Sequence, residues 1–399
     1  MPAIPIKPGI YWIGVNDRTT DLFEGVWPIG QTGVSYNSYL ILDEKKALVD
    51  LAKAAQGGEF LEQIYDLTDP ATLDYVILNH MEPDHTGVLN VLRQIAPQAT
   101  LLCTAKALPM LAAYYGLREN IRAVADGEEL PLGEKRLRFV AAPFVHWPET
   151  MVTYELTQRV LFSCDAFGGY GALRGALFDD QCTDLDFYLQ EALRYYANIV
   201  ASFSGPTLRA IEKLAGVPLD VVAPSHGLVW RRDPQRIVQL YKRWAQYATQ
   251  PAEPGVTLVY GSMYGHTERM MNAVAEGISA AGVPLQILDA ARTHVSFILP
   301  ALWTQRGVML GAPTYESGLF PPVAHVLDMA GRKRIQHKQV ALFGSFGWSG
   351  GAERECKQKV EELKWSWWDS LIFNGHPTAE DLHRGIEFGR RFAEAVAQS

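Results

Sequence analysis

The stretch His80-Met-Glu82-Pro-Asp84-His85 decides how this sequence is interpreted, because it places four potential metal ligands within six residues. It follows directly on the apolar run 73–78, which predicts a buried strand. A loop at a strand end can fold back around an ion, and a polar loop without a metal rarely carries such a density of ligands. We therefore interpret this segment as part of a metal site.

Three more polar side chains follow predicted strands further along the chain. His146 follows the predicted strand 136–141, Asp165 follows 159–163, and His226 follows 219–223. Each residue alone has an ordinary structural explanation, such as a hydrogen-bonded core histidine or a carboxylate that caps a turn. Because all of them come just after strands, we expect them to converge on one edge of a sheet.

The first 250 residues alternate short apolar runs with polar or amphipathic segments. Residues 38–42 and 46–50 predict a strand pair joined by a turn. Residues 88–95 and 186–199 carry apolar side chains at helical spacing and predict helices. This half of the chain is therefore expected to mix strands and helices.

The best linker candidate is 251–255, Pro-Ala-Glu-Pro-Gly, because two prolines and a glycine resist both helix and central strand. Beyond it the pattern becomes a regular alternation of strands and helices. The expected strands are 256–260, 284–288, 307–310 and 339–343. Such alternation predicts a parallel sheet covered by helices on both faces.

Three loops of this second half follow strands and are rich in glycine and hydroxyl groups: 260–268, 311–318 and 344–351. In open α/β sheets, ligands bind at the carboxyl ends of the strands. The first loop offers Ser262, Gly265 and Thr267 at a helix N-terminus, which suits a phosphate. It lacks the lysine of a nucleotidase P-loop and the G-x-G-x-x-G of a dinucleotide site, which argues against both of these kinds of site.

Composition excludes several classes of protein. The formal charge of −8, from 36 basic and 44 acidic residues, argues against nucleic-acid binding. No apolar stretch approaches the roughly 18 residues of a membrane span, and the N-terminus does not resemble a secretory signal. The four cysteines contain no C-x-x-C pair, so we expect neither a disulfide framework nor a cysteine-ligated cluster. We therefore expect the protein to be cytoplasmic.

The pattern His80-x-Glu82-x-Asp84-His85, followed by a distant histidine, aspartate and histidine, resembles the metallo-β-lactamase fold. Hydrolases of that fold usually have histidine at the position of Glu82 and bind zinc. With glutamate there, the chain resembles the iron-binding version found in flavodiiron proteins, and the resemblance spans essentially its whole length. It implies an α/β fold, with an N-terminal αββα sandwich over 1–250, the linker 251–255, and a flavodoxin-like doubly wound parallel sheet over 256–399.

The resemblance also assigns the ligands of two iron ions. It implies one iron on His80, Glu82 and His146, the other on Asp84, His85 and His226, and a bridge through Asp165. In some family members the histidine equivalent to His85 lies off the metal, so its role stays open. Four histidines and three carboxylates suit redox-active iron, and zinc is the alternative.

The first glycine-rich loop resembles the flavodoxin phosphate loop, although Tyr264 and His266 depart from its usual residues. The resemblance implies that all three loops contact FMN, with Trp348 or Tyr315 covering a face of the ring. The implied contacts are Ser262, Met263, Tyr264, Gly265, His266, Thr267, Pro313, Thr314, Tyr315, Glu316, Ser317, Gly318, Ser345, Phe346, Gly347, Trp348, Ser349 and Gly350.

A two-electron carrier joined to a redox-active metal pair indicates an oxidoreductase that reduces a small molecule. The resemblance implies reduction of dioxygen to water, of nitric oxide to nitrous oxide, or of both. It also implies a head-to-tail homodimer or a dimer of dimers, and an external electron donor, either rubredoxin or a reduced deazaflavin. The alternatives are a zinc hydrolase with an accessory flavin domain, and a non-catalytic electron carrier or redox sensor.

Overall fold

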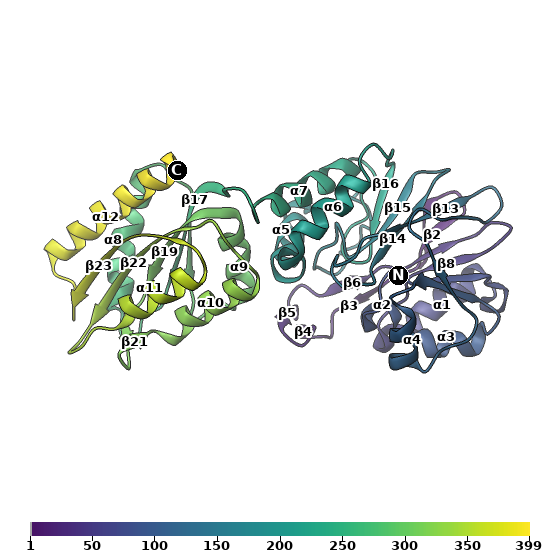
Figure 1. Cartoon of the computed structure of the whole chain (residues 1–399), viewed down its shortest axis with the longest axis horizontal. Coiled ribbons are helices and arrows are strands. Elements are labelled where there is room, and N and C mark those ends of the chain that lie inside the picture. The colour runs from purple at the N-terminus through teal and green to yellow at the C-terminus, as the bar shows by residue number, and fades with distance from the viewer. Residues whose placement is uncertain (1) are drawn as a thin grey trace. The chain divides into compact units, whose positions relative to one another are not determined.

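The computed structural model describes residues 2–399, which divide into two compact units at Lys242 and Arg243. We call these the first and the second unit, and Figure 1 shows that each has its own sheets and helices. The division falls inside helix α7 (Pro234–Gln246), whose last turn is tied to the second unit. There Arg243 Nε donates a hydrogen bond to Glu253 at 2.9 Å, and Trp303 Nε1 donates one to the Trp244 carbonyl, also at 2.9 Å.

The first unit contains two principal sheets, with α1, α3 and α4 near the first and α5, α6 and α7 near the second (Figure 1). The first sheet runs in the order β1 (Ile4–Lys7), β2 (Ile10–Trp12), β7 (Tyr39–Ile41), β8 (Ala47–Val49), β9 (Tyr75–Ile77), β10 (Thr100–Thr104) and β11 (Ile121–Val124). The second sheet runs in the order β12 (Glu129–Pro131), β13 (Arg136–Ala141), β14 (Met151–Glu155), β15 (Val160–Cys164) and β16 (Val221–Pro224). All residues of β7, β8, β14, β15 and β16 are buried, and most of their side chains are apolar.

The other elements of this unit are six helices besides α7 and two short strand pairs. The helices are α1 (Gly57–Leu67), α2 (Pro83–Thr86), α3 (Leu89–Ile95), α4 (Leu108–Tyr115), α5 (Leu185–Tyr195) and α6 (Ser204–Lys213). The inner hairpin pairs β4 (Leu22–Phe23) with β5 (Trp27–Pro28), and the strands on either side of it in the chain, β3 (Val15–Asp17) and β6 (Val34–Tyr36), pair with each other. The helix expected over 186–199 is not uniform, because α5 is followed by a π-helical turn at Tyr196–Val200.

The second unit contains a five-stranded sheet in which every neighbouring pair is parallel. Its strands run in the order β18 (Leu285–Asp289), β17 (Glu253–Tyr260), β19 (Gln305–Gly311), β22 (Gln339–Phe346) and β23 (Ser366–Asn374). Figure 1 shows helices on both faces: α8 (His266–Ala280), α9 (Val295–Thr304), α10 (Pro321–Arg332), α11 (Ala352–Glu362) and α12 (Ala379–Gln398). A short hairpin joins β20 (Thr314–Tyr315) to β21 (Gly318–Leu319). This architecture confirms the predicted doubly wound parallel sheet.

Strand β17 begins at Glu253, inside the segment predicted as a linker. The prolines and glycine there do not end the strand, because the register against β19 shifts between Glu253 and Val256. Such an irregularity accommodates a residue that cannot donate to the ladder, here Pro254. No helix within residues 2–399 is both long enough and apolar enough to cross a bilayer.

Candidate metal centre and flavin cavity

The candidate metal centre lies where strands of both sheets of the first unit end. His80 follows β9, His146 follows β13, Asp165 follows β15 directly, and His226 follows β16. At the end of β15 the backbone turns sharply, since Cys164 has a φ of 54°, a value that non-glycine residues seldom adopt. The expected convergence of these side chains is therefore present.

One group of side chains surrounds the Glu82 carboxylate. Its Oε2 atom lies 3.2 Å from Nε2 of His80 and 3.0 Å from Nε2 of His146. His80 is fully buried, and the Glu82 side chain keeps 13% of its exposure. Three ligand atoms thus point at one small volume.

The second group surrounds the Asp84 carboxylate. Its Oδ1 atom lies 3.5 Å from Nε2 of His85, and its Oδ2 atom lies 3.4 Å from Nε2 of His226. Both imidazoles are buried. His85, whose role the sequence leaves open, therefore points its Nε2 atom into this group.

Asp165 joins the two groups, one with each of its oxygens. Its Oδ2 atom lies 3.6 Å from His80 Nε2 and 3.7 Å from His146 Nε2. Its Oδ1 atom lies 3.2 Å from His85 Nε2 and 3.3 Å from His226 Nε2. A carboxylate in this position suits a bridge between two ions.

The residues present fit a pair of metal ions. Both oxygens of Asp84, and Nε2 of His85 and of His226, are buried atoms without a hydrogen-bond partner among the described residues. Leaving buried polar atoms unpaired costs about 1–3 kcal/mol each, so such a cluster is expected only where something else binds them. Imidazole nitrogens and carboxylate oxygens are ligands that iron and zinc both accept.

In the metal-free chain His80 holds a proton that a metal must displace, whereas Asp165 is already ionised. Burial alone would lower the pKa of His80, but its hydrogen bonds with Glu149 and Glu82 raise that pKa to about 9. Burial would raise the pKa of Asp165, but the neighbouring His85 charge outweighs it and holds the pKa of that carboxyl well below its usual range.

We therefore expect metal loading to release protons. His80 is protonated in the metal-free chain below its pKa of about 9, and only neutral imidazole binds a metal. Metal affinity should accordingly rise as the pH is raised towards that value. Titration calorimetry at neutral pH, in two buffers of different ionisation enthalpy, measures the protons released; identical heats in both buffers would contradict this expectation.

Four hydrogen bonds with residues outside the two groups fix the orientation of the ligands. Glu149 Oε1 accepts from His80 Nδ1 at 2.7 Å and from the Met81 amide at 3.0 Å. The Ser35 carbonyl lies 2.8 Å from His226 Nδ1. The Tyr195 hydroxyl donates to Asp165 Oδ1 at 2.9 Å. These contacts set the ring tautomers, so that each Nε2 atom is free to face a metal.

Glu149 was not predicted from the sequence as a site residue, although it lies only three residues after His146. Its replacement by alanine should lower metal affinity about 10–100-fold, because His80 loses the acceptor that orients its ring. Glutamine keeps an acceptor oxygen, so Glu149→Gln should lower metal affinity less than Glu149→Ala does. Competition with a chelator of known affinity measures the difference, and equal affinities in all three proteins would refute this role.

Aromatic rings surround the metal centre and limit the access of water. Trp147 packs edge-on against His80, with ring centroids 4.9 Å apart. Phe23, from the hairpin β4–β5, packs edge-on against His226 at 5.6 Å and against Tyr170 at 5.4 Å. An enclosed site of this kind strengthens the electrostatic interactions inside it.

The second unit holds a cavity of about 690 Å³ at the carboxyl ends of its strands. A cavity of this volume is in the range that binds a cofactor. The three loops predicted for the flavin supply almost the whole wall: Ser262, Met263, Tyr264, His266, Thr267, Pro313, Thr314, Tyr315, Glu316, Ser317, Ser345, Phe346, Gly347, Trp348 and Ser349.

Three predicted contacts do not border this cavity, and one residue of its wall was missed. Gly265 caps the N-terminus of α8 with a φ of 87°, and Gly318 faces Glu355 instead. Gly350 is likewise absent from the wall. Gly375 follows the edge strand β23, which was not predicted from the sequence, and it borders the cavity.

Two aromatic side chains of the wall are accessible to a ring system. Trp348 is 96% exposed and Tyr315 is 41% exposed. Exposed aromatic side chains beside a cavity are unusual unless a ligand or a partner covers them. The prediction that one of them stacks on a flavin remains untested.

Known proteins resemble this chain over both units. Residues 34–227 match the family described as ODP family beta lactamase, and residues 258–387 match the flavodoxin family. The chain is 33% identical to a nitric oxide reductase of Moorella thermoacetica, over 99% of both sequences.

Two solved structures are similar over almost the full length. Rubredoxin oxygen:oxidoreductase from Desulfovibrio gigas superposes with a TM-score of 0.93 and 29% identity, over 99% of each chain. The flavodiiron protein from Giardia intestinalis superposes with a TM-score of 0.94 and 28% identity, over 100% of this chain and 98% of that one.

Proposed function

Because the chain belongs to the flavodiiron protein family, we propose that it reduces dioxygen to water, nitric oxide to nitrous oxide, or both. The observation that carries this proposal is the position of Asp165, with one carboxylate oxygen facing each group of ligands. A bridging carboxylate serves two ions that act together on one substrate.

We assign one iron to His80, Glu82 and His146, the other to Asp84, His85 and His226, and the bridge to Asp165. All seven side chains lie in residues 1–250, which we take as the diiron domain. Glu82 separates this ligand set from that of zinc hydrolases, in which histidine usually stands there. A site without thiolate, rich in carboxylate and imidazole, also suits iron.

When bound, two ferrous ions and reduced FMN supply four electrons, which suffices to reduce dioxygen to two waters. The residues of this chain then have three tasks. Hydrogen bonds with Glu149 and Tyr195 keep His80 and Asp165, respectively, in place. Phe23 and Trp147 limit the entry of water. The ligands hold both ions close enough to act on one small molecule.

We place FMN in the cavity of the second unit, within residues 256–399. Thr267 and the loop from Ser262 lie at the N-terminus of α8, where backbone amides and the helix dipole favour a phosphate. Trp348 and Tyr315 both line this cavity, and we propose that one or the other covers a face of the isoalloxazine ring.

Within these 399 residues there is no C-x-x-C pair, so we propose a separate electron donor such as a rubredoxin. A reduced deazaflavin is the second candidate. We also propose a head-to-tail homodimer or a dimer of dimers, as in the family. All four cysteines are free thiols, which is compatible with the reducing cytoplasm.

The deciding experiment measures iron, zinc and FMN per chain. It then measures the consumption of dioxygen and of nitric oxide with reduced rubredoxin as the electron donor. We expect two irons and one FMN per chain, together with consumption of dioxygen or nitric oxide. Two zinc ions with hydrolytic activity would indicate a metallo-β-lactamase-like hydrolase. Reversible flavin reduction without turnover would indicate an electron carrier.

A further inference from the structure

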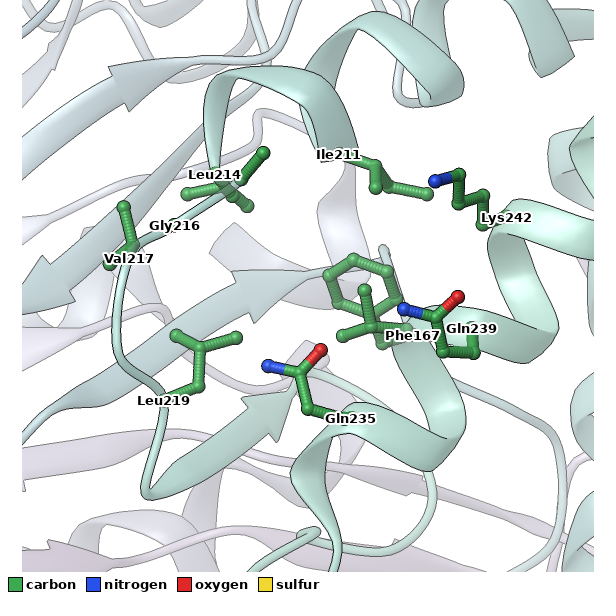
Figure 2. Close-up of a pocket in the computed structure, with 11 residues that line it drawn as sticks. Phe167, Ile211, Leu214, Gly216, Val217, Leu219, Gln235, Gln239 and Lys242 are labelled. Atoms are coloured by element: carbon green, nitrogen blue, oxygen red, sulfur yellow. The ribbon is translucent and has the colours of Figure 1, made fainter.

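A surface hollow of about 220 Å³ lies in the first unit between α7 and the segment that follows α6 (Figure 2). Its rim carries three exposed polar side chains, Gln235, Gln239 and Lys242, which share one face of α7. Below the rim the wall is apolar, and the side chains there are Ile211, Leu214, Val217, Leu219 and Val238.

Phe167 forms part of this wall, and its labelled ring lies between the two helical segments in Figure 2. The residue is only 2% exposed and stands two positions after Asp165. Its backbone has a φ of 68°, a conformation that costs a phenylalanine about 1 kcal/mol or more. Its ring packs edge-on against Tyr241, with centroids 5.3 Å apart.

Phe167 also borders a second, inner cavity of about 10 Å³. The wall of this inner cavity includes the metal-centre residue His226 and Tyr170, as well as Gly168, Gly169 and Gly227. A Cβ atom at position 169 would lie 2.8 Å from Ala192 Cα, so only glycine fits at this point of the wall. This volume is close to what one water-sized molecule needs.

Phe167 is thus the one side chain shared by the surface hollow and the cavity that reaches His226. We infer that the hollow, the Phe167 ring and the inner cavity form an entry route for a diatomic gas to the metal centre. This inference rests on the proposed function, because it names the path of the substrate of that same site.

The chemistry of the wall favours such a ligand. Dioxygen and nitric oxide are small and almost apolar, so they can pass the apolar side chains below the rim without losing strong hydrogen bonds to water. In this route the ring of Phe167 moves aside to connect the two cavities.

A matched pair of tryptophan variants tests the route. Val238→Trp fills the hollow described above. Val140→Trp fills a neighbouring hollow of about 270 Å³ that Phe167 does not border. Because Val238 is buried, Gln239→Trp at the exposed rim serves as a second blocking variant that should fold normally. Iron and FMN content are measured first for each protein.

The first readout is independent of activity. Crystals of the intact chain under xenon pressure should bind xenon against the apolar side chains below the polar rim of the hollow. The site should be lost in Val238→Trp and retained in Val140→Trp. Absence of xenon from the hollow of the unaltered protein would overturn the route, whether or not the enzyme reduces either gas.

The second readout is the second-order rate constant of the pre-reduced enzyme with each gas. Both blocking variants should lower it about tenfold, with turnover at saturating gas unchanged, while Val140→Trp should react normally. Equal constants in all variants would overturn the route but leave the proposed function intact. If no variant reacts with either gas although iron and FMN are bound, the proposed function fails instead.

Discussion

Replacing Asp165 with alanine is expected to remove metal from both groups of ligands and to abolish gas reduction, while FMN stays bound. Each oxygen of this carboxylate faces a different group, at 3.2–3.7 Å from the histidine nitrogens. Without it, four imidazoles and two carboxylates remain, with no ligand between the two ions. The loss should exceed the 10–100-fold change in metal affinity typical of outer-sphere residues.

Metal analysis after gel filtration measures the loss of metal. FMN absorbance shows whether the flavin stays bound, and gas consumption measures the loss of activity. Asp126→Ala is the matched control, because Asp126 is also an aspartate of the first unit. It forms an exposed ion pair with Lys213, which contributes about 0–1 kcal/mol, and accepts a hydrogen bond from the Ala141 amide at 2.8 Å. Full iron content and full activity in Asp165→Ala would exclude the bridge.

The position of the metal centre could be predicted because its ligands follow strands. Apolar runs identify the strands, and residues such as His146 and Asp165 then fall at their ends. Glu149 could not be found in this way. Its contact with His80 joins positions 69 residues apart, and nothing in the sequence pairs them.

Local patterns also miss irregular or weakly patterned elements. Residues 186–199 have helical spacing throughout, but the π-helical turn after Tyr195 depends on packing that spacing does not report. Strand β23 lies at the edge of its sheet, and four of its nine residues, such as Ser366 and Asn374, are polar, so it lacks the apolar run of a central strand. Gly375 was missed for the same reason.

The complementary variant, Gly351→Ala, should lose FMN and keep its metal. Gly351 has a φ of 154°, and a Cβ atom there would lie 1.9 Å from the Ser317 carbonyl oxygen. Ser317 lines the flavin cavity, as do Ser345 to Ser349 of the loop before Gly351. The two loops must therefore move apart, which costs a few kcal/mol and should weaken FMN binding about 100-fold or more.

The variant Gly350→Ala shows whether FMN binding is lost because of the steric clash at Gly351 or because any substitution in this loop weakens it. A Cβ atom at Gly350 meets nothing within 4 Å, so FMN affinity should stay unchanged, whereas the adjacent Gly351→Ala should lose it. Titration of the metal-loaded proteins with FMN, followed by flavin fluorescence, compares the two. Because Gly351 and Asp165 belong to different compact units, each variant should empty only its own site. If Gly351→Ala bound FMN normally, or lost iron along with it, the assignment of the flavin to this cavity would be wrong.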